Sequence, residues 1–504
     1  MERLKQHGLV LASYRGPVAE DGTSLAAGGL ASALREITRL VPTTWVAEGS
    51  RSLRMEPGGT RLAAVRIPDA ERTAFYGGFA NRLYWMLAHG LYRGYPRHEV
   101  RRWYADGYRP ANTRFAAALD RTLAGDFQEA TVWVHDYHLM LVPALLRERR
   151  PEARIGFFLH VPWPCLETWR ASPEAPVADL VRGLLGADLL AFQTVRDAQR
   201  FLAAVSETVP EGHVVWAPVE REGHLGDSSS MVGEVRVGRR RVGIQADPIS
   251  IDPESVRESA RSPRAARWFE SLAPLSPDVQ TIVRVDRLDP AKNITGGFAA
   301  FESYLRSHPD RIGRTRFLAF LVPTRESVPE YREYRRRVLE QVASFNAEFG
   351  RETLPEPIRL FVQHNQEAAL GGLGRADAVL INSLADGMNL VAKELTMAER
   401  RSPVLVLSRT CGVAEAFSDG ALLVDPGDLA QTAKNLERAL DMEEGERRVR
   451  MRRLRGHVLK WTVRDWAYAQ LEALASDAES APYATAEELP RPSPEIRRVR
   501  TAVW

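Results

Sequence analysis

A chain of 504 residues is longer than one hydrophobic core usually organises, so we expect two domains of roughly 200 to 250 residues each. Its 44% hydrophobic and 26% charged residues are typical of a globular protein and exclude a disordered or fibrous chain. The 68 basic and 65 acidic residues leave a net charge of only +3, which does not indicate a nucleic-acid partner.

The cysteine count and the apolar runs restrict the cellular compartment that we expect for this chain. Only Cys165 and Cys411 are present, which excludes a disulfide framework and a thiolate zinc site and fits a reducing cytoplasm. The first apolar run is too short for a signal peptide, and no run reaches the roughly 18 apolar residues of a spanning helix. Basic runs at 332–337 and 447–455 have amphipathic, helical surroundings that favour ion-paired faces. We therefore expect a cytoplasmic protein with no membrane partner.

The N-terminal half alternates strand and helix signals. An apolar run at Leu9–Ala12 precedes a loop that contains Gly28 and Gly29, and a helical pattern follows. Apolar runs at 130–135 and 155–160 end in polar residues and precede helical patterns, as does a run at 188–192. Such runs are typical of strands buried on both faces of a parallel sheet. Residues 207–238 turn polar and glycine-rich, which indicates surface hairpins or a loop.

The alternation starts again in the C-terminal half. Strand signals lie at 281–288, 317–323, 358–364, 377–382, 404–408 and 421–425, and the last helical pattern covers 461–474. The segment from 476 onward is polar and proline-rich, which predicts loose order. We predict an N-terminal domain at 1–246, a C-terminal domain at 247–475 and a flexible tail at 476–504.

The predicted fold class is α/β, with two doubly wound, Rossmann-like domains that face each other across a cleft. Parallel sheets of this kind bind ligands beyond the carboxyl ends of their strands. We therefore expect the residues that carry chemistry to gather at this cleft.

Two cations follow the strand signal at 281–288. Arg287 and Lys292 are five residues apart in VDRLDPAKN, so both side chains can face the cleft and clamp a diphosphate, the arginine as a planar fork and the lysine as a point charge. The alternative is that they are ion-pair partners of Asp286 and Asp289. These residues alone favour the alternative.

A second segment, DGMNLVAKE at 386–394, follows the strand signal at 377–382. Gly387 permits a tight turn, and the amides of Met388 and Asn389 would open a helix and attract an anion or sugar hydroxyls. Glu394, two turns on, could accept from both hydroxyls of a ribose. The alternative is an ordinary helix capped by Asp386.

Two further signals are weak by themselves. The pair Gly28 and Gly29 precedes a helical pattern but lacks the spacing of the common nucleotide fingerprints, so an ordinary loop is the alternative. The sequence HDYH offers His135, Asp136 and His138, but no further ligand cluster accompanies them, which makes zinc improbable. We interpret Asp136 as an acceptor of substrate hydroxyl hydrogen bonds.

The joint order of these motifs resembles the trehalose-6-phosphate synthases, which are retaining glycosyltransferases of family 20. The resemblance covers about 9–474 and rests on LASYRGP, FYGGFANRLYW, WVHDYHLMLVPALLR, IGFFLHVPWP, VDRLDPAKN, LVPTRESVPEY and ADGMNLVAKE. It implies the GT-B architecture, in which a C-terminal helix returns to the N-terminal domain. The segment DPAKN in particular resembles actinobacterial members.

The resemblance assigns an acceptor site in the N-terminal domain. Arg15 would bind the phosphate of the acceptor, with Tyr76, Trp85 and Arg325 beside it. Asp136 would position the acceptor sugar.

The resemblance also assigns a donor site. Its residues would be Gly28, Gly29, Arg287, Lys292, Gly387, Met388, Asn389, Leu390, Val391 and Glu394. His160 and Asp386 would hold hydroxyls of the donor sugar. The implied catalytic set is Arg287, Lys292, Asp386, His160 and Asp136, with no metal and no cofactor.

The implied reaction transfers glucose from UDP- or GDP-glucose to glucose 6-phosphate and forms α,α-trehalose 6-phosphate. One alternative is a pseudo-glycosyltransferase, or an enzyme for another phosphorylated polyol or cyclitol. A second is a catalytically silent homologue that senses sugar phosphate, which the joint presence of Arg287, Lys292, Asp386 and Glu394 disfavours. The residues do not decide the donor base or the oligomeric state, and a homo-oligomer is compatible with them.

Overall fold

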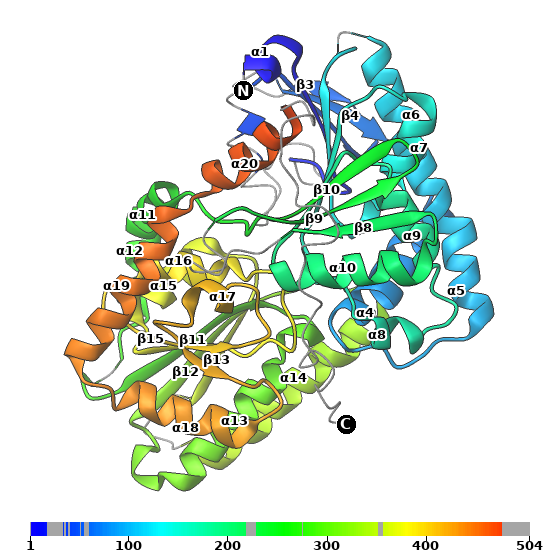
Figure 1. The fold of residues 1–504 in the computed structure, drawn as a ribbon. Coiled ribbons are helices and arrows are strands. Elements are labelled where there is room, and N and C mark those ends of the chain that lie inside the picture. The colour runs from blue at the N-terminus through cyan, green and yellow to red at the C-terminus, as the bar shows by residue number, and fades with distance from the viewer. Residues whose placement is uncertain are drawn as a thin grey trace.

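The computed structural model describes residues 2–17, 34, 37–38, 41–50, 52–54, 60–125, 127–217, 228–274, 276–350 and 356–475. It contains two β-sheets covered by helices, one in each half of the molecule (Figure 1). The predicted α/β class is confirmed. Gly28, Gly29 and the predicted tail at 476–504 lie outside the described residues.

The first sheet has ten strands in the order β3-β4-β2-β1-β5-β6-β7-β10-β9-β8. Every neighbouring pair from β4 to β10 is parallel, whereas β3, β9 and β8 are antiparallel additions at the edges. The predicted hairpin region thus forms edge strands. The bounds are β1 Leu9–Ala12, β2 Thr43–Glu48, β3 Leu53–Arg54, β4 Arg61–Val65, β5 Thr131–His135, β6 Ile155–Leu159, β7 Leu189–Phe192, β8 Gly212–Trp216, β9 Ser230–Val237 and β10 Arg240–Ala246.

The second sheet has six parallel strands in the order β13-β12-β11-β14-β15-β16. The bounds are β11 Gln280–Arg287, β12 Thr315–Val322, β13 Ile358–Val362, β14 Ala378–Ile381, β15 Val404–Ser408 and β16 Leu422–Val424. In this doubly wound order the strand sequence reverses between β11 and β14, and in the first sheet it reverses between β1 and β5. Ligand sites are expected beyond the carboxyl ends of those strands.

Helices cover both faces of each sheet. In β11, Ile282 belongs to the core under α13 (Ile294–Ser307) and α14 (Pro329–Phe349). Its neighbour Val283 belongs to the core under α15 (Gln366–Arg375) and α16 (Leu390–Ala398), as the two-residue period of a strand requires. The helices before β11 are α1 Glu2–His7, α3 Asp69–Arg72, η1 Thr73–Tyr84, α4 Trp85–Ala88, α5 Arg97–Trp103, η2 Tyr104–Tyr108, α6 Arg109–Ala124, η3 Tyr137–Leu139, α7 Val142–Arg149, α8 Leu166–Arg170, α9 Val177–Leu184, α10 Val195–Thr208, α11 Pro253–Arg261 and α12 Pro263–Ser271.

The later helices include the last one, which returns to the first sheet. They are η4 Pro290–Lys292, α13 Ile294–Ser307, η5 Pro309–Arg311, α14 Pro329–Phe349, α15 Gln366–Arg375, α16 Leu390–Ala398, α17 Ala414–Phe417, α18 Leu429–Leu440, α19 Glu444–Lys460 and α20 Val463–Ala475. On α20, Gln470 Oε1 accepts from Trp133 Nε1 of β5 at 3.1 Å, and Trp466 lies 5.2 Å from the Trp133 ring. The predicted return of the C-terminal helix is confirmed (Figure 1).

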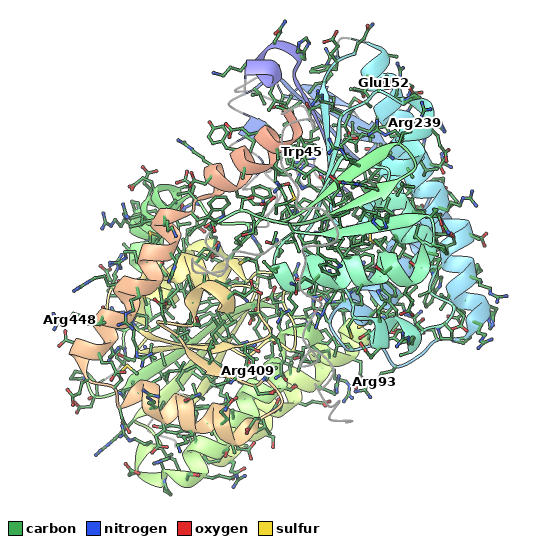
Figure 2. The ribbon with its side chains drawn as sticks, in the orientation of Figure 1. Trp45, Arg93, Glu152, Arg239, Arg409 and Arg448 are labelled. Atoms are coloured by element: carbon green, nitrogen blue, oxygen red, sulfur yellow. The ribbon has the colours of Figure 1, made fainter. Side chains whose placement is uncertain are left out.

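Charged side chains occupy the periphery, where Arg93, Glu152, Arg239 and Arg448 are exposed, while Trp45 is buried (Figure 2). The basic runs form ion-paired helix faces, as predicted: Arg448 pairs with Glu444 at 2.8 Å on α19. None of the helices in the described residues is both long and apolar enough to span a bilayer.

Candidate functional site

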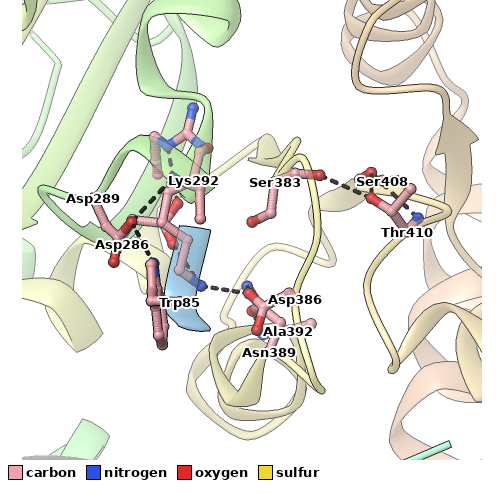
Figure 3. Close-up of polar contacts among 12 residues, drawn as sticks. Trp85, Asp286, Asp289, Lys292, Ser383, Asp386, Asn389, Ala392, Ser408 and Thr410 are labelled. Carbon is pink, nitrogen blue, oxygen red and sulfur yellow. Dashed lines mark hydrogen bonds and ion pairs between the residues drawn. The ribbon is translucent and has the colours of Figure 1, made fainter. Parts of the chain in front are cut away.

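Two loops meet beyond the carboxyl ends of β11 and β14 (Figure 3). β11 ends at Arg287 and the chain turns through η4 to Lys292, while β14 leads to Asp386. The ammonium of Lys292 donates to Asp386 Oδ2 and lies 3.5 Å from Asp286 Oδ1. The structure therefore brings two of the predicted site residues into direct contact.

Both members of this contact are charged. Burial opposes the charged form of each, but Asp386 and Asp286 raise the pKa of Lys292 above its usual value. Burial would likewise raise the pKa of Asp386, yet Lys292 and Asn389 hold it below its usual value. Because only 10% of the Lys292 side chain and 16% of the Asp386 side chain are exposed, water screens the pair weakly.

Arg287 differs from Lys292. Its side chain is exposed at the end of β11, and no hydrogen bond or ion pair joins its guanidinium to any other described residue. Of the ion pairs that the sequence left open between these two cations and Asp286 or Asp289, the described residues form only the pair of Lys292 with Asp286. Asp289 is bound by Arg325 instead, whose Nη1 lies 2.6 Å from Asp289 Oδ2.

Asn389 begins α16. It has a φ of 79°, and its Oδ1 accepts from the Ala392 N–H at 3.2 Å, which makes it the N-cap. The alternative that Asp386 caps this helix is wrong, because its carboxylate accepts from Lys292 and from Asn389 Nδ2, the latter at 3.0 Å. The N–H groups of residues 388–391 have no acceptor within the part of the chain that the structure describes. They can therefore bind a ligand.

Gly387 lies against the backbone of the other half of the molecule. A Cβ at this position would lie 2.1 Å from the carbonyl oxygen of His160, which follows β6. Only a glycine allows the two backbones to approach this closely. The predicted donor loop and the predicted His160 thus share one site.

The first turns of α16 carry the other predicted donor residues. Leu390 and Val391 are half-buried, so they offer apolar surface beside the N–H groups. Burial raises the pKa of Glu394 to about 7, and no described residue pairs with its carboxylate.

The reversal point of the first sheet carries the predicted acceptor residues. Arg15 follows β1, and its Nη2 donates to the Tyr76 hydroxyl at 2.9 Å. Asp136 directly follows β5 with a φ of 76°, and its Oδ1 accepts from the His160 N–H at 3.3 Å. Burial raises the pKa of Asp136 to about 6.

Arg325 reaches this point from the second sheet. Its guanidinium lies 3.8 Å from the centroid of the Trp85 ring, and its Nη2 donates to the Tyr137 hydroxyl at 3.2 Å. Arg287 lies over the same ring at 5.3 Å. Burial would raise the pKa of Tyr76, but Arg325 and Arg15 lower it. The structure thus brings Arg15, Arg287 and Arg325 around two aromatic rings.

His160 is neutral at physiological pH. Burial lowers its pKa to about 3, and its Nε2 lies 3.2 Å from His135 Nδ1. A neutral imidazole can hold a hydroxyl by a hydrogen bond, but it cannot serve as a cation.

Comparison with known proteins identifies the family. Residues 49–476 match glycosyltransferase family 20. The chain belongs to glycosyltransferase family 20. It is 35% identical over 483 residues to the trehalose-6-phosphate synthase of Mycolicibacterium smegmatis, covering 94% of this chain and 92% of the relative. It is 34% identical to a bifunctional trehalose-6-phosphate synthase/phosphatase of Thermoproteus tenax over 85% of this chain, which spans 56% of that relative's length.

Solved structures agree with the GT-B fold. An alpha,alpha-trehalose-phosphate synthase (UDP-forming) from Burkholderia xenovorans in complex with glucose-6-phosphate matches with a TM-score of 0.80 and 28% identity over 93% of this chain and 100% of that one. An E. coli structure bound with UDP-2-fluoro glucose matches with a TM-score of 0.79 and 27% identity over 93% of this chain and 99% of that one. This family 20 glycosyltransferase is therefore an enzyme with two facing parallel-sheet domains.

Sequence reasoning missed several residues of this glycosyltransferase's site. Tyr137 and Tyr331 both contact the Arg325 guanidinium, and His89 Nδ1 lies 2.8 Å from the Trp85 carbonyl oxygen. Tyr137 lies inside HDYH, next to Asp136, and its place in the motif was the signal that could have found it. Among the described residues, no group of three or more His, Cys, Asp or Glu side chains is placed to hold a metal ion.

Proposed function

We propose that this glycosyltransferase transfers glucose from UDP- or GDP-glucose to glucose 6-phosphate and forms α,α-trehalose 6-phosphate with retention of configuration. The observation that carries the proposal is the placement of cations at both strand-order reversal points around one site, with Lys292 and Arg287 at one and Arg15 at the other. Two phosphorylated substrates require two such groups. The related structures that hold glucose-6-phosphate or UDP-2-fluoro glucose support the same substrates here.

In this proposal the donor binds beyond β11 and β14. Arg287 and Lys292 bind the diphosphate, which also accepts hydrogen bonds from the N–H groups of residues 388–391 that have no acceptor among the described residues. Glu394 accepts hydrogen bonds from the ribose hydroxyls, and Leu390 and Val391 pack near the base.

The acceptor binds beyond β1 and β5. Arg15 and Arg325 bind its phosphate with Tyr76 and Trp85 beside them, because an arginine fork can hold two phosphate oxygens at once. Asp136 accepts a hydrogen bond from a hydroxyl of the acceptor sugar.

The chemistry requires a stabilised leaving group. The bond between the donor's anomeric carbon and the diphosphate oxygen breaks while the acceptor's anomeric oxygen forms a new bond to the same face of that carbon. The acceptor's proton passes to the leaving phosphate oxygen, and Arg287 and Lys292 stabilise the charge that develops there. His160 and Asp386 hold hydroxyls of the donor sugar and thereby fix the reacting carbon.

The two substrates correspond to the two proposed domains. Residues 1–246 supply most of the acceptor site and residues 247–475 most of the donor site, with the first sheet ending at Ala246. Arg325 and His160 each reach the substrate of the other domain. Arg325 and Gly387 lie where the domains touch, so substrate binding is coupled to their closure.

A product assay tests the proposal. The purified protein is incubated with UDP-glucose, GDP-glucose or ADP-glucose and either glucose 6-phosphate or unphosphorylated glucose, and the products are identified by mass and by NMR of the anomeric protons. We expect an α,α-linked disaccharide phosphate from glucose 6-phosphate and a poor reaction with glucose. Absence of that product with every donor contradicts the proposal, and a product only with other polyol or cyclitol phosphates identifies that alternative.

A further inference from the structure

A ladder of alternating charges, formed by Arg284, Asp286, Lys292 and Asp386, runs from the core of the second domain to the proposed donor site. Arg284 Nε donates to Asp286 Oδ2 at 2.9 Å, and Asp286 Oδ1 lies 3.5 Å from the ammonium of Lys292, which binds Asp386. Figure 3 shows the outer part of this ladder. The exposed fraction of the side chains rises along it from 0% and 2% to 10% and 16%.

Arg284 acts on Lys292 in two ways, one indirect and one direct. Through Asp286 it fixes the position of the ammonium, and its Nη2 also donates to the backbone carbonyl of Lys292. The neighbouring Ala291 carbonyl accepts from the Leu384 N–H at 2.8 Å, which ties the loop after β11 to the loop after β14. A buried ion pair is often no more stabilising than apolar residues of the same volume, so its placement beneath Lys292 points to a role in the site.

We propose that Arg284 and Asp286 are positioning residues that hold Lys292 in place and protonated while it exchanges Asp386 for the donor diphosphate. This inference rests on the proposed function. A diphosphate that binds Lys292 competes with Asp386 for the same ammonium. Burial raises the pKa of Asp286, and Lys292 and Arg284 oppose that rise, so Asp286 remains as the counter-charge during the exchange. Asp386 becomes available to accept a hydrogen bond from a hydroxyl of the sugar.

The other groups that face Lys292 leave the two carboxylates as its only anionic partners among the described residues. Arg287 opposes its charge from β11. His89, beyond α4, has its pKa lowered to about 4 by burial and is neutral, and burial raises the pKa of the Cys411 thiol, which is therefore neutral as well. Once Asp386 engages the sugar, Asp286 alone maintains the charge of Lys292.

The test is the pH profile of kcat/KM for the nucleotide sugar from about pH 6 to about pH 10 in the full chain. In Asp286→Asn we expect the alkaline limb to move down by roughly one pH unit, because the ammonium loses a counter-charge within about 4 Å. In Arg284→Met we expect it to move down as well, because Arg284 opposes the rise that burial causes in the pKa of Asp286 and holds that carboxylate against the ammonium. Titration of the substrate is common to all proteins and cancels in the comparison.

Asp377→Asn is the matched control. Asp377 is equally buried and lies 3.3 Å from Arg401, but it is at the amino end of β14, away from Lys292. We expect this variant to change thermal stability without moving the alkaline limb, and Asp286→Glu to restore the wild-type profile. Limbs that do not move in Asp286→Asn and Arg284→Met, with the wild type active, overturn the proposal. If Asp286→Asn does not fold, Arg284→Met decides alone.

Failure of the proposed function can be told apart from failure of this inference. If the wild type forms no product with any donor, calorimetric binding of UDP and GDP across the same pH range is measured on the same proteins. Affinity that falls at lower pH in Asp286→Asn than in the wild type supports the positioning role. Equal profiles, or no binding by the wild type, overturn it.

Discussion

Arg15 and Lys292 occupy corresponding places, each beyond the carboxyl end of the first strand of its sheet, but their partners differ. Arg15 donates to the hydroxyl of Tyr76, whereas Lys292 is held by two carboxylates. A cation that hydrogen-bonds to a hydroxyl can bind a phosphate without breaking an ion pair. A cation held by carboxylates must break one of its ion pairs to do so. Under the proposed assignment, the first site therefore binds its phosphate without losing an ion pair, and the second exchanges one.

The two regions also differ in how they are held. Tyr14 stacks on Tyr76 at 5.0 Å and on His138 at 4.9 Å, so packed rings fix the first region. The charge ladder of Arg284, Asp286 and Lys292 fixes the second. The same doubly wound topology thus supports a rigid site in one domain and a switchable one in the other.

The largest expected effect is on the donor cations. Lys292→Ala and Arg287→Ala each should lower kcat by the equivalent of about 2.7 to 4 kcal/mol, the cost of losing one donor to a developing oxyanion. Saturating kinetics with both substrates measure this loss, and Arg239→Ala, at an exposed position in the turn between β9 and β10, is the control. Turnover near that of the wild type in both donor-site variants contradicts the account.

A substitution at Gly387 should have the next largest effect. Gly387→Ala places a methyl group against the His160 carbonyl oxygen and pushes the two domains apart, and a displacement of about 1 Å can reduce kcat about 100-fold. Gly456→Ala is the control, because no atom lies within 4 Å of a Cβ built there. Equal kcat values in the two variants would show that the close approach is not needed for catalysis.

Glu394 should give the donor site its own pH dependence. Its pKa of about 7 lies above the usual value, so its carboxylate form is lost as pH falls through about 7, and a protonated carboxyl cannot accept from both ribose hydroxyls. KM for the donor should rise below that pH by on the order of tenfold, and Glu394→Gln should remove the pH dependence. The raised pKa also means that Glu394 contributes less to folding stability as pH rises toward 7. An unchanged donor profile in Glu394→Gln contradicts this role.

Chelation should have the smallest effect. In the proposed mechanism Arg287 and Lys292 perform the charge stabilisation that a divalent ion performs in other transferases, so excess EDTA should leave the rate essentially unchanged. Loss of activity that one divalent ion restores contradicts a metal-free mechanism.

Much of the fold could be predicted because buried parallel strands appear as apolar runs. The predicted strand at 404–408 matches β15, and the one at 281–288 differs from β11 by one residue. Side-chain partners could not be predicted, since Lys292 binds Asp386 across 94 residues of sequence. Asn389 was missed as the cap because Asp386 is an equally good capping residue by type. Arg284 was a visible signal, because it is a charge inside an apolar strand with Asp286 two residues on at the same face. Only the fold shows that this pair lies against Lys292.

The measurement that tests the central claim most directly is a two-substrate kinetic matrix on the wild type, Arg15→Ala, Arg325→Ala and Arg287→Ala. The account predicts that Arg15→Ala and Arg325→Ala raise KM for glucose 6-phosphate far more than KM for the nucleotide sugar, whereas Arg287→Ala lowers kcat and weakens donor binding. Arg325→Ala should also lower thermal stability, because it leaves the buried Asp289 unpaired. If Arg15→Ala and Arg287→Ala alter KM for the same substrate, or if neither arginine of the acceptor site affects glucose 6-phosphate, the assignment of one substrate to each reversal point is contradicted.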